Sequence, residues 1–212
     1  DAVGDRDAPR RARAAAPRRG GAPGRRRYDR SMLDETQDRA FYDDLDATLE
    51  EAWRRLARGA ADRRSELHTI QLATTGRDGA PRLRTVVLRC VDRSARRLRA
   101  HTDRRSAKIA ELAAEPRVAL HGYDARAKIQ LRLSGRATVH LDDAAASAAW
   151  AATQGGSRVC YRGLAPGRPL AAPGDGDTTP AMRAPDDPES GREKIAALLI
   201  EADSLEWLYL AA

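Results

Sequence analysis

Short stretches of alternating apolar and polar residues, separated by turn signals, fill most of the sequence between residues 67 and 140. This alternation is typical of β-strands that bury one face. The pair Asp78-Gly79 favours a tight hairpin turn between the first two stretches. The predicted strands are 67–75, 82–91, 97–102, 117–124 and 127–140, with a helix at 106–115 that ends before Pro116.

The carboxyl-terminal part predicts two more strands, at 194–203 and 204–210, although the first of them also fits a helix. Strands joined by short hairpins run antiparallel, and a small antiparallel meander removes its exposed edges by closing. We therefore expect a mainly β fold with flanking helices, built on a closed or split β-barrel rather than a sandwich. Gly135, inside the last of the earlier strands, predicts a bulge or a close backbone approach.

Two more helices are predicted outside the strand region. Apolar residues recur at three- and four-residue steps from Phe41 to Leu56, which indicates an amphipathic helix that Gly59 ends. Residues 142–153 form the second helix, with acidic residues at its N-terminus. Residues 163–192 are dense in proline, glycine and aspartate, and we expect them to form a long mobile loop.

The net charge of +7 is concentrated at the start of the chain. Residues 1–30 contain ten arginines and four aspartates and carry +6, which leaves +1 for all later residues. This segment is rich in proline, glycine and alanine and has almost no large apolar residues, so it predicts a disordered tail. We expect nucleic acid to be bound at most weakly, through this tail, and residues 31–212 to form one folded domain.

No pattern in the sequence indicates a metal site, a disulfide framework or a membrane span. Cys90 and Cys160 lie far apart, and the four histidines lack the spacing of helical metal ligands. No apolar run approaches the roughly 18 residues of a membrane helix, and no secretory segment is visible. These features predict a cytoplasmic protein without a membrane partner.

The segment HTDRRSAKIAEL, residues 101–112, crowds hydrogen-bond donors where a strand passes into a helix. Helix N-termini offer free N–H groups and the positive end of the helix dipole, which favour phosphate. Thr102 and Ser106 add hydroxyls, and Arg104, Arg105 and Lys108 add charge. The chain has 35 arginines and three lysines, so a lysine here fits a need for a compact point charge. The residues leave two interpretations open, a solvated turn or a pocket for an anion.

Three segments resemble the pyridoxamine 5'-phosphate oxidase-like, FMN-binding split-barrel family. Its first hairpin is similar to LATTGRDGAPRLRTVVLRCVD, its strand–helix–strand segment to HTDRRSAKIAELAAEPRVALHGY, and a later strand to IQLRLSGRA. The resemblance spans about residues 67–140 and is strongest to the oxidase-related bacterial subgroup, whose substrates are mostly unassigned. It implies a split barrel, FMN as cofactor, a small-molecule substrate, and a homodimer with FMN at the subunit interface.

The resemblance also implies which residues contact the cofactor. Arg84 and Lys108 would hold the FMN phosphate, with help from Thr102 and Ser106, and the backbone of residues 85–87 would lie along the isoalloxazine. The full implied set is Arg84, Thr85, Val86, Val87, Thr102, Arg105, Ser106, Lys108, Gln130 and Trp207.

Three of the implied roles concern the flavin ring and the substrate. Gln130 would form a hydrogen bond near the polar edge of the flavin ring, and Trp207 would help to cover the ring. Arg89 stands where the true oxidases have a lysine that binds the substrate phosphate. Arg104 or Arg105 would compensate for Ala107, which stands where many relatives have a second basic residue.

The sequence departs from the true oxidases in two respects. Tyr161 is followed at four-residue steps by Ala165 and Pro169, so a tyrosine–arginine–serine substrate pattern is not met. The chain also ends at Ala212, before the family's last arginine- and histidine-rich strand. No general acid or base stands out. We predict an FMN-binding flavoprotein, an oxidoreductase of unassigned substrate; the alternatives are a split barrel that binds deazaflavin or haem, and a non-catalytic binding module.

Overall fold

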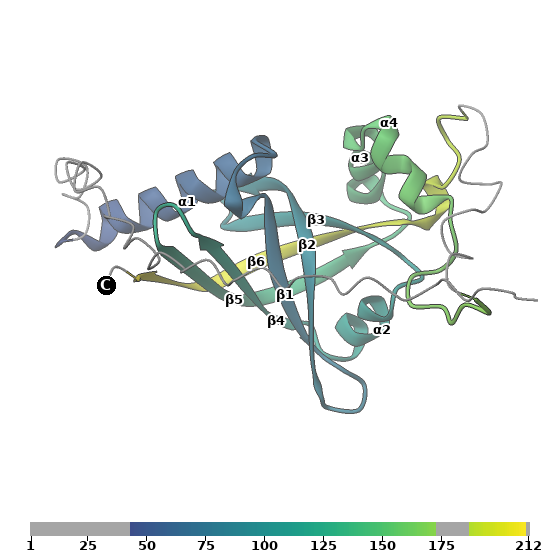
Figure 1. Ribbon diagram of the computed structural model, residues 1–212, viewed down its shortest axis with the longest axis horizontal. Coiled ribbons are helices and arrows are strands. Elements are labelled where there is room, and N and C mark those ends of the chain that lie inside the picture. Colours follow the sequence, from purple (N-terminus) through teal and green to yellow (C-terminus); the bar gives the residue numbers. More distant parts are fainter. Residues whose placement is uncertain (1–42, 173–186, 211–212) are drawn as a thin grey trace, which may run out of the picture. The chain divides into compact units, whose positions relative to one another are not determined.

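Six antiparallel strands close into a barrel in the computed structural model, which describes residues 43–172 and 187–210 (Figure 1). The order around the barrel is β1-β2-β3-β6-β5-β4, so the last strand closes the sheet between β3 and β5. The predicted antiparallel barrel with flanking helices is therefore confirmed. The strands are β1 Thr69–Thr75, β2 Pro81–Asp92, β3 Arg97–Asp103, β4 Arg117–Asp124, β5 Ile129–His140 and β6 Ile195–Tyr209.

Alternation along each strand fills the barrel with aliphatic side chains. In β5, Ile129, Leu131 and Leu133 are at most 3% exposed, whereas Arg132 and Ser134 between them face outward. The same alternation buries Leu72 in β1 and the inward-facing aliphatic side chains of the other strands. One continuous core results, and residues on the outer wall remain available for binding.

β6 is a single strand of 15 residues, so the prediction of two strands at 194–203 and 204–210 was wrong. Its first four residues, Ile195 to Leu198, are all buried, because the barrel interior covers one face and helix α3 covers the other. Burial on both faces removes the alternation that marks a strand, which is why this run also resembled a helix.

Gly135 lies where β5 crosses β6 at a register shift, as its position in the sequence predicted. Ser134 pairs with Ser204 and Gly135 with Ala202, so Asp203 is the extra residue of a bulge in β6. A Cβ atom on Gly135 would stand 2.0 Å from the carbonyl oxygen of Glu201. The two backbones touch at this position, and only glycine fits.

Four helices and three short 3-10 turns flank the barrel: α1 Leu45–Ala61, α2 Ala107–Ala114, α3 Ala144–Ala152, α4 Gly155–Arg158, η4 Glu66–His68, η5 Val159–Tyr161 and η7 Arg192–Lys194. The predicted amphipathic first helix buries Trp53 and Leu56 in the core but leaves Leu45 exposed. The helix continues past Gly59 to Ala61. Position 59 is a glycine because the backbone of Leu67 lies so close that a side chain there would collide with it. The expectation that Gly59 ends the helix was therefore wrong.

Several predictions fall wholly or partly outside the described residues. These are the basic tail 1–30 and the central part, 173–186, of the predicted loop. Within the described ranges no helix has the length and apolar character needed to cross a membrane. Cys90 and Cys160 are both free and exposed. A cytoplasmic location remains a prediction.

Candidate functional site

Strand β2 changes partners halfway along its length. It pairs with β1 over Pro81–Val87 and with β3 from Leu88 to Asp92. Over residues 84–87, the backbone edge that faces away from β1 therefore has no strand beside it among the described residues. An unpaired strand edge presents N–H and C=O groups to whatever lies next to it. This unpaired edge is an opening between β2 and β3 in an otherwise closed barrel.

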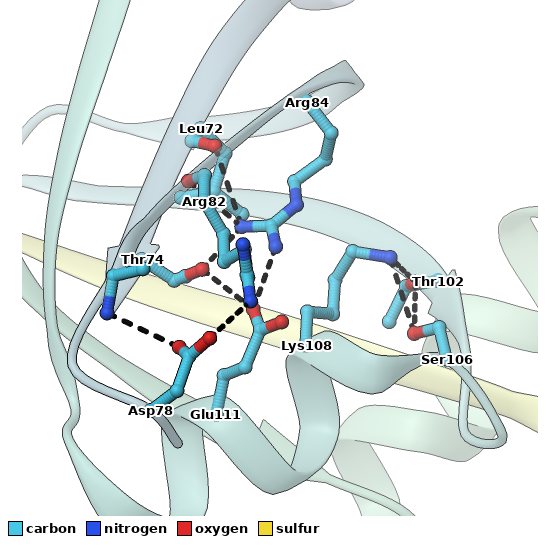
Figure 2. A network of polar contacts seen from close by, with 10 residues as sticks. Leu72, Thr74, Asp78, Arg82, Arg84, Thr102, Ser106, Lys108 and Glu111 are labelled. Atoms are coloured by element: carbon cyan, nitrogen blue, oxygen red, sulfur yellow. Dashed lines mark hydrogen bonds and ion pairs between the residues drawn. The ribbon is translucent and has the colours of Figure 1, made fainter. Parts of the chain in front are cut away.

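Helix α2 begins just after β3 and packs against β1 and β5, near this opening. Lys108, in its first turn, donates to Thr102 Oγ1 at 2.8 Å and to Ser106 Oγ at 3.1 Å (Figure 2). Both hydroxyl residues are buried. Ser106 occupies the N-cap position but makes no side-chain cap, because its hydroxyl accepts from Lys108 instead. The hydroxyls hold the ammonium in place without neutralising it.

The charge on Lys108 has no direct counter-ion in the part of the chain that the structure describes. No carboxylate oxygen there lies within 4 Å of Nζ, the distance limit for an ion pair. Burial lowers the pKa of Lys108 and the nearby Arg84 guanidinium lowers it further, against smaller opposing effects of Glu111 and Asp103. Desolvation and a like charge both act against the ammonium, so an anionic ligand beside it would be stabilised.

Arg84 lies on the other side of Lys108 and is held in a fixed position (Figure 2). Its Nη2 donates to Glu111 Oε2 at 2.6 Å, and its Nη1 donates to the Thr74 hydroxyl. Thr74 in turn donates to Glu111 Oε2 at 2.6 Å. Glu111 is 7% exposed and Arg84 23% exposed in their side chains. These contacts engage the Nη side of the guanidinium, and among the described residues none accepts from its Nε–H.

We predict that Glu111→Gln lowers the free energy of unfolding by about 2 kcal/mol, because it leaves a half-buried guanidinium without its counter-charge. Urea denaturation followed by circular dichroism would measure the change. Glu193→Gln is the matched control, since this glutamate is exposed and its contact with Lys194 is 3.5 Å long. If the Glu111 variant has the same free energy of unfolding as the wild type, the ion pair between Arg84 and Glu111 does not stabilise the fold.

The structure brings Arg84, Thr102, Ser106 and Lys108 together, but not the whole predicted set. Arg105 donates to Asp103 at 2.6 Å and to the carbonyl oxygen of Gly163 at 3.1 Å. Its charge is therefore paired with Asp103, as that of Arg84 is paired with Glu111, and its role beside Ala107 stays a prediction. The sequence could not settle these contacts, because it does not show which carboxylate and carbonyl oxygens lie within reach of Arg105 in the fold.

Gln130 and Trp207 lie apart from this cluster. Gln130 is on the outer wall of β5, between Tyr123 and Leu208, and β4 and β1 separate it from β2. Three strand spacings amount to about 14 Å. Trp207 packs against the barrel core, and the Arg55 guanidinium lies 5.9 Å from its ring centroid. Neither residue lies on an element that carries Arg84, Thr102 or Lys108.

The three residues of β2 implied to flank the flavin ring face different ways. The side chain of Val86 is buried in the core, whereas Thr85 is exposed and Val87 is half-buried. A ring at this strand would therefore meet its free backbone edge and the side chains of Thr85 and Val87, not that of Val86.

A second group of basic side chains lies further along the same wall and was missed from the sequence, apart from Arg89. Arg99 and His101 are two residues apart on β3 and so share its outer face. Both Arg99 and Arg89 lie close enough to act on the charge of His101. The spacing of Arg99 and His101 in a predicted strand was the signal available in the sequence.

We predict that His101 makes the protein less stable in mild acid. Burial lowers its pKa from 6.5 to about 4, with further lowering by Arg99 and Arg89. Below pH 6.5 the unfolded chain takes up a proton that the folded chain refuses until about pH 4, so stability falls as the pH drops through this window, by about 2 kcal/mol. Urea denaturation at several pH values should show a shallower loss for His101→Gln. An identical loss in that variant would contradict the prediction.

The fold and this site together define a class of protein, the antiparallel split barrels with a cluster of basic and hydroxyl side chains beside the helix after β3. A family model described as the FMN-binding domain of pyridoxamine 5'-phosphate oxidase matches residues 50–141. Pyridoxine/pyridoxamine 5'-phosphate oxidase 2 of Arabidopsis thaliana is 32% identical over 171 residues, which cover 74% of this chain and 83% of that protein. The chain belongs to the pyridoxamine 5'-phosphate oxidase FMN-binding family.

Solved structures share the fold. A pyridoxamine 5'-phosphate oxidase-related, FMN-binding protein from Nostoc punctiforme is 24% identical with a TM-score of 0.62, over 76% of this chain and 83% of that one. PhzG from Burkholderia lata, solved with tetrahydrophenazine-1-carboxylic acid, is 19% identical with a TM-score of 0.61, over 82% and 85% of the two chains. Membership supports a flavoprotein of the oxidoreductase kind and does not identify the substrate.

Proposed function

We propose that this chain binds FMN and acts as an oxidoreductase on a small molecule. The phosphate of FMN would lie against Lys108 and the free Nε–H of Arg84, with the hydroxyls of Thr102 and Ser106 beside it. The isoalloxazine would lie along the unpaired backbone edge of residues 84–87. When bound, FMN supplies the redox chemistry by taking up and releasing a hydride or an electron pair.

One observation carries this proposal. Lys108 is an ammonium group held by two buried hydroxyls, with no carboxylate within ion-pair distance among the described residues. Arg84, by contrast, has its counter-charge in Glu111. Such an arrangement favours a ligand that arrives with negative charge, and a phosphate monoester fits the mixture of point charge and hydroxyl donors.

We further propose that the protein is a homodimer. The outer wall around Gln130 carries large exposed side chains, with Tyr123 42% exposed on one neighbouring strand and Leu208 48% exposed on the other. A second subunit on this wall would bury these side chains and bring Gln130 of one subunit toward the flavin of the other. Sedimentation equilibrium should give twice the chain mass.

The direct experiment is a visible spectrum of the purified protein after incubation with FMN and desalting. We expect the flavin absorption to stay with the protein and free FMN fluorescence to be quenched on binding. A colourless protein after desalting, with no saturable quenching in a titration, would overturn the proposal. Saturable binding of a deazaflavin or haem without binding of FMN would replace FMN by that cofactor.

A further inference from the structure

The three lysines of the chain stand in three different environments. Lys128 is exposed at the turn between β4 and β5. Lys194 is half-buried, and its Nζ lies 3.5 Å from Glu193 Oε1. Lys108 is also half-buried, but no carboxylate oxygen of the described residues lies within 4 Å of its Nζ. Burial of Lys108 is therefore not offset by an ion pair.

The surroundings of Lys108 favour loss of its proton. Burial has the largest effect and lowers the pKa of Lys108, and the Arg84 guanidinium on β2 lowers it further. Glu111 on α2 and Asp103 at the end of β3 act in the opposite direction. Each of these carboxylates is already paired at 2.6 Å, Glu111 with Arg84 and Asp103 with Arg105. An amine that is partly desolvated beside a cation more readily takes its neutral, nucleophilic form.

Two hydroxyls orient this amine. Lys108 Nζ donates to Thr102 Oγ1 at 2.8 Å and to Ser106 Oγ at 3.1 Å, and both hydroxyl residues are buried (Figure 2). A neutral amine has two N–H bonds and one lone pair in a tetrahedral arrangement. When both N–H groups are donated to these oxygens, the lone pair takes the remaining direction, away from them. The hydroxyls therefore hold the amine as a nucleophile, whereas a carboxylate would hold it as an ammonium.

The neighbouring donors indicate which reagent fits. No described residue accepts from the Arg84 Nε–H, and the two hydroxyls lie beside Nζ, so a phosphate bound here contacts the amine itself. In an acyl phosphate the reactive carbonyl carbon is bonded directly to a phosphate oxygen. A phosphate held by these donors therefore brings that carbon within reach of the lone pair, and the reaction gains the advantage of a pre-assembled pair.

We propose that Lys108 is a site of covalent acylation by acyl phosphates, and that acylation closes the site to FMN. The neutral amine attacks the carbonyl carbon, a C–N bond forms, and the bond from that carbon to the phosphate oxygen breaks. The electron pair of the broken bond leaves with inorganic phosphate, which also takes up the proton that the amine nitrogen releases. The product is an uncharged amide. Its effect on FMN rests on the proposed function, whereas the acylation itself needs only the cluster around Lys108.

The three lysines make the wild-type chain its own control. The full-length protein, stripped of bound flavin, is incubated with acetyl phosphate, and peptide mass spectrometry follows the acetylated fraction of each lysine. We expect Lys108 to react at least about tenfold faster than Lys128 or Lys194, because the reagent is bound beside it. Inorganic phosphate should slow the reaction of Lys108 alone. The proposal fails if Lys108 reacts no faster than the other two lysines, or if inorganic phosphate leaves its rate unchanged.

Ser106→Ala tests the orientation of the amine. Ser106 makes no side-chain cap on α2, so its loss should leave the helix intact. We expect acetylation of Lys108 to slow about two- to tenfold, the usual worth of one hydrogen bond. Ser147→Ala removes an exposed serine on α3 and is the matched control, with the rate of the wild type. Equal rates in the two variants would show that the hydroxyl of Ser106 does not prepare the amine.

FMN titrations separate this proposal from the proposed function. FMN should protect Lys108 from acetyl phosphate, and protein acetylated at Lys108 should bind FMN at least about tenfold more weakly than untreated protein. If acetylated and untreated protein bind FMN equally well, acylation does not close the site and the proposal is wrong. If untreated protein does not bind FMN but Lys108 is still acetylated selectively and protected by phosphate, the proposed function fails and the acylation site stands.

Discussion

Replacement of Lys108 by alanine is expected to weaken FMN binding about ten- to a hundredfold, since a hydrogen bond to a charged group contributes roughly 1.5–3 kcal/mol. Lys108 is the charge with no counter-ion in the described part of the cluster, whereas Arg84 is already paired with Glu111. The loss of Lys108 should therefore be felt by the ligand and not by the fold. Quenching of FMN fluorescence gives the dissociation constant of each variant.

Two variants sharpen this test. Lys108→Arg should recover only part of the affinity, because a planar guanidinium cannot take the place of a compact ammonium between Thr102 and Ser106. Lys128→Ala removes an exposed lysine at the turn between β4 and β5 and should leave the dissociation constant unchanged. If Lys108→Ala binds FMN as tightly as Lys128→Ala does, the ammonium is only a solvated side chain and the phosphate binds elsewhere.

Replacement of Gly135 by alanine is expected to lower the free energy of unfolding by about 3 kcal/mol, at the upper end of the usual cost of overpacking. The added Cβ would stand 2.0 Å from the carbonyl oxygen of Glu201 and 3.1 Å from the Cα of Ala202. Both atoms belong to the backbone of β6, so neither can rotate away as a side chain would. Urea denaturation followed by circular dichroism should show the loss directly.

Gly156→Ala is the control for this variant, because a Cβ there meets nothing within 4 Å. Gly156 lies in α4, where alanine is favoured over glycine by about 1 kcal/mol, so its stability should stay equal or rise slightly. If Gly135→Ala is as stable as Gly156→Ala, the crossing of β5 and β6 is looser than this structure shows.

The two basic groups on this chain differ in what holds them. Lys108 is fixed by hydroxyls and Arg84 by Glu111, so the cluster around Lys108 is built before any ligand arrives. Arg89 and Arg99 have no such support among the described residues.

Much of the barrel could be predicted because its causes are local. Alternation along each strand depends on which side chains point inward, and the hairpin at Asp78-Gly79 depends on the conformational freedom of glycine, which has φ +79° at this turn. Three predicted cofactor residues, Thr102, Ser106 and Lys108, meet because a strand, a turn and a helix follow one another along the chain, whereas Arg84 comes from β2. The resemblance to the family rests on the same local patterns.

The partners of the charged groups were decided only by tertiary structure. Thr74 and Glu111 are 37 residues apart in the chain, yet they share one hydrogen bond and together hold Arg84. Nothing in the sequence distinguishes Arg97, which finds Glu201, from Arg99, which finds no carboxylate. Electrostatic pairing depends on which distant strand becomes a neighbour, and alternation carries no information about that.

The position of Trp207 shows the same limit in a single residue. Before the bulge in β6, Leu198, Ile200 and Ala202 face the core; after Asp203 the inward positions include Trp207 instead. A one-residue shift turns every later side chain to the opposite face. The sequence by itself determined that this stretch is a strand and that Gly135 touches a neighbour. Only the pairing of β5 with β6 decided which side of the wall the tryptophan occupies, because the extra residue exists only relative to the partner strand.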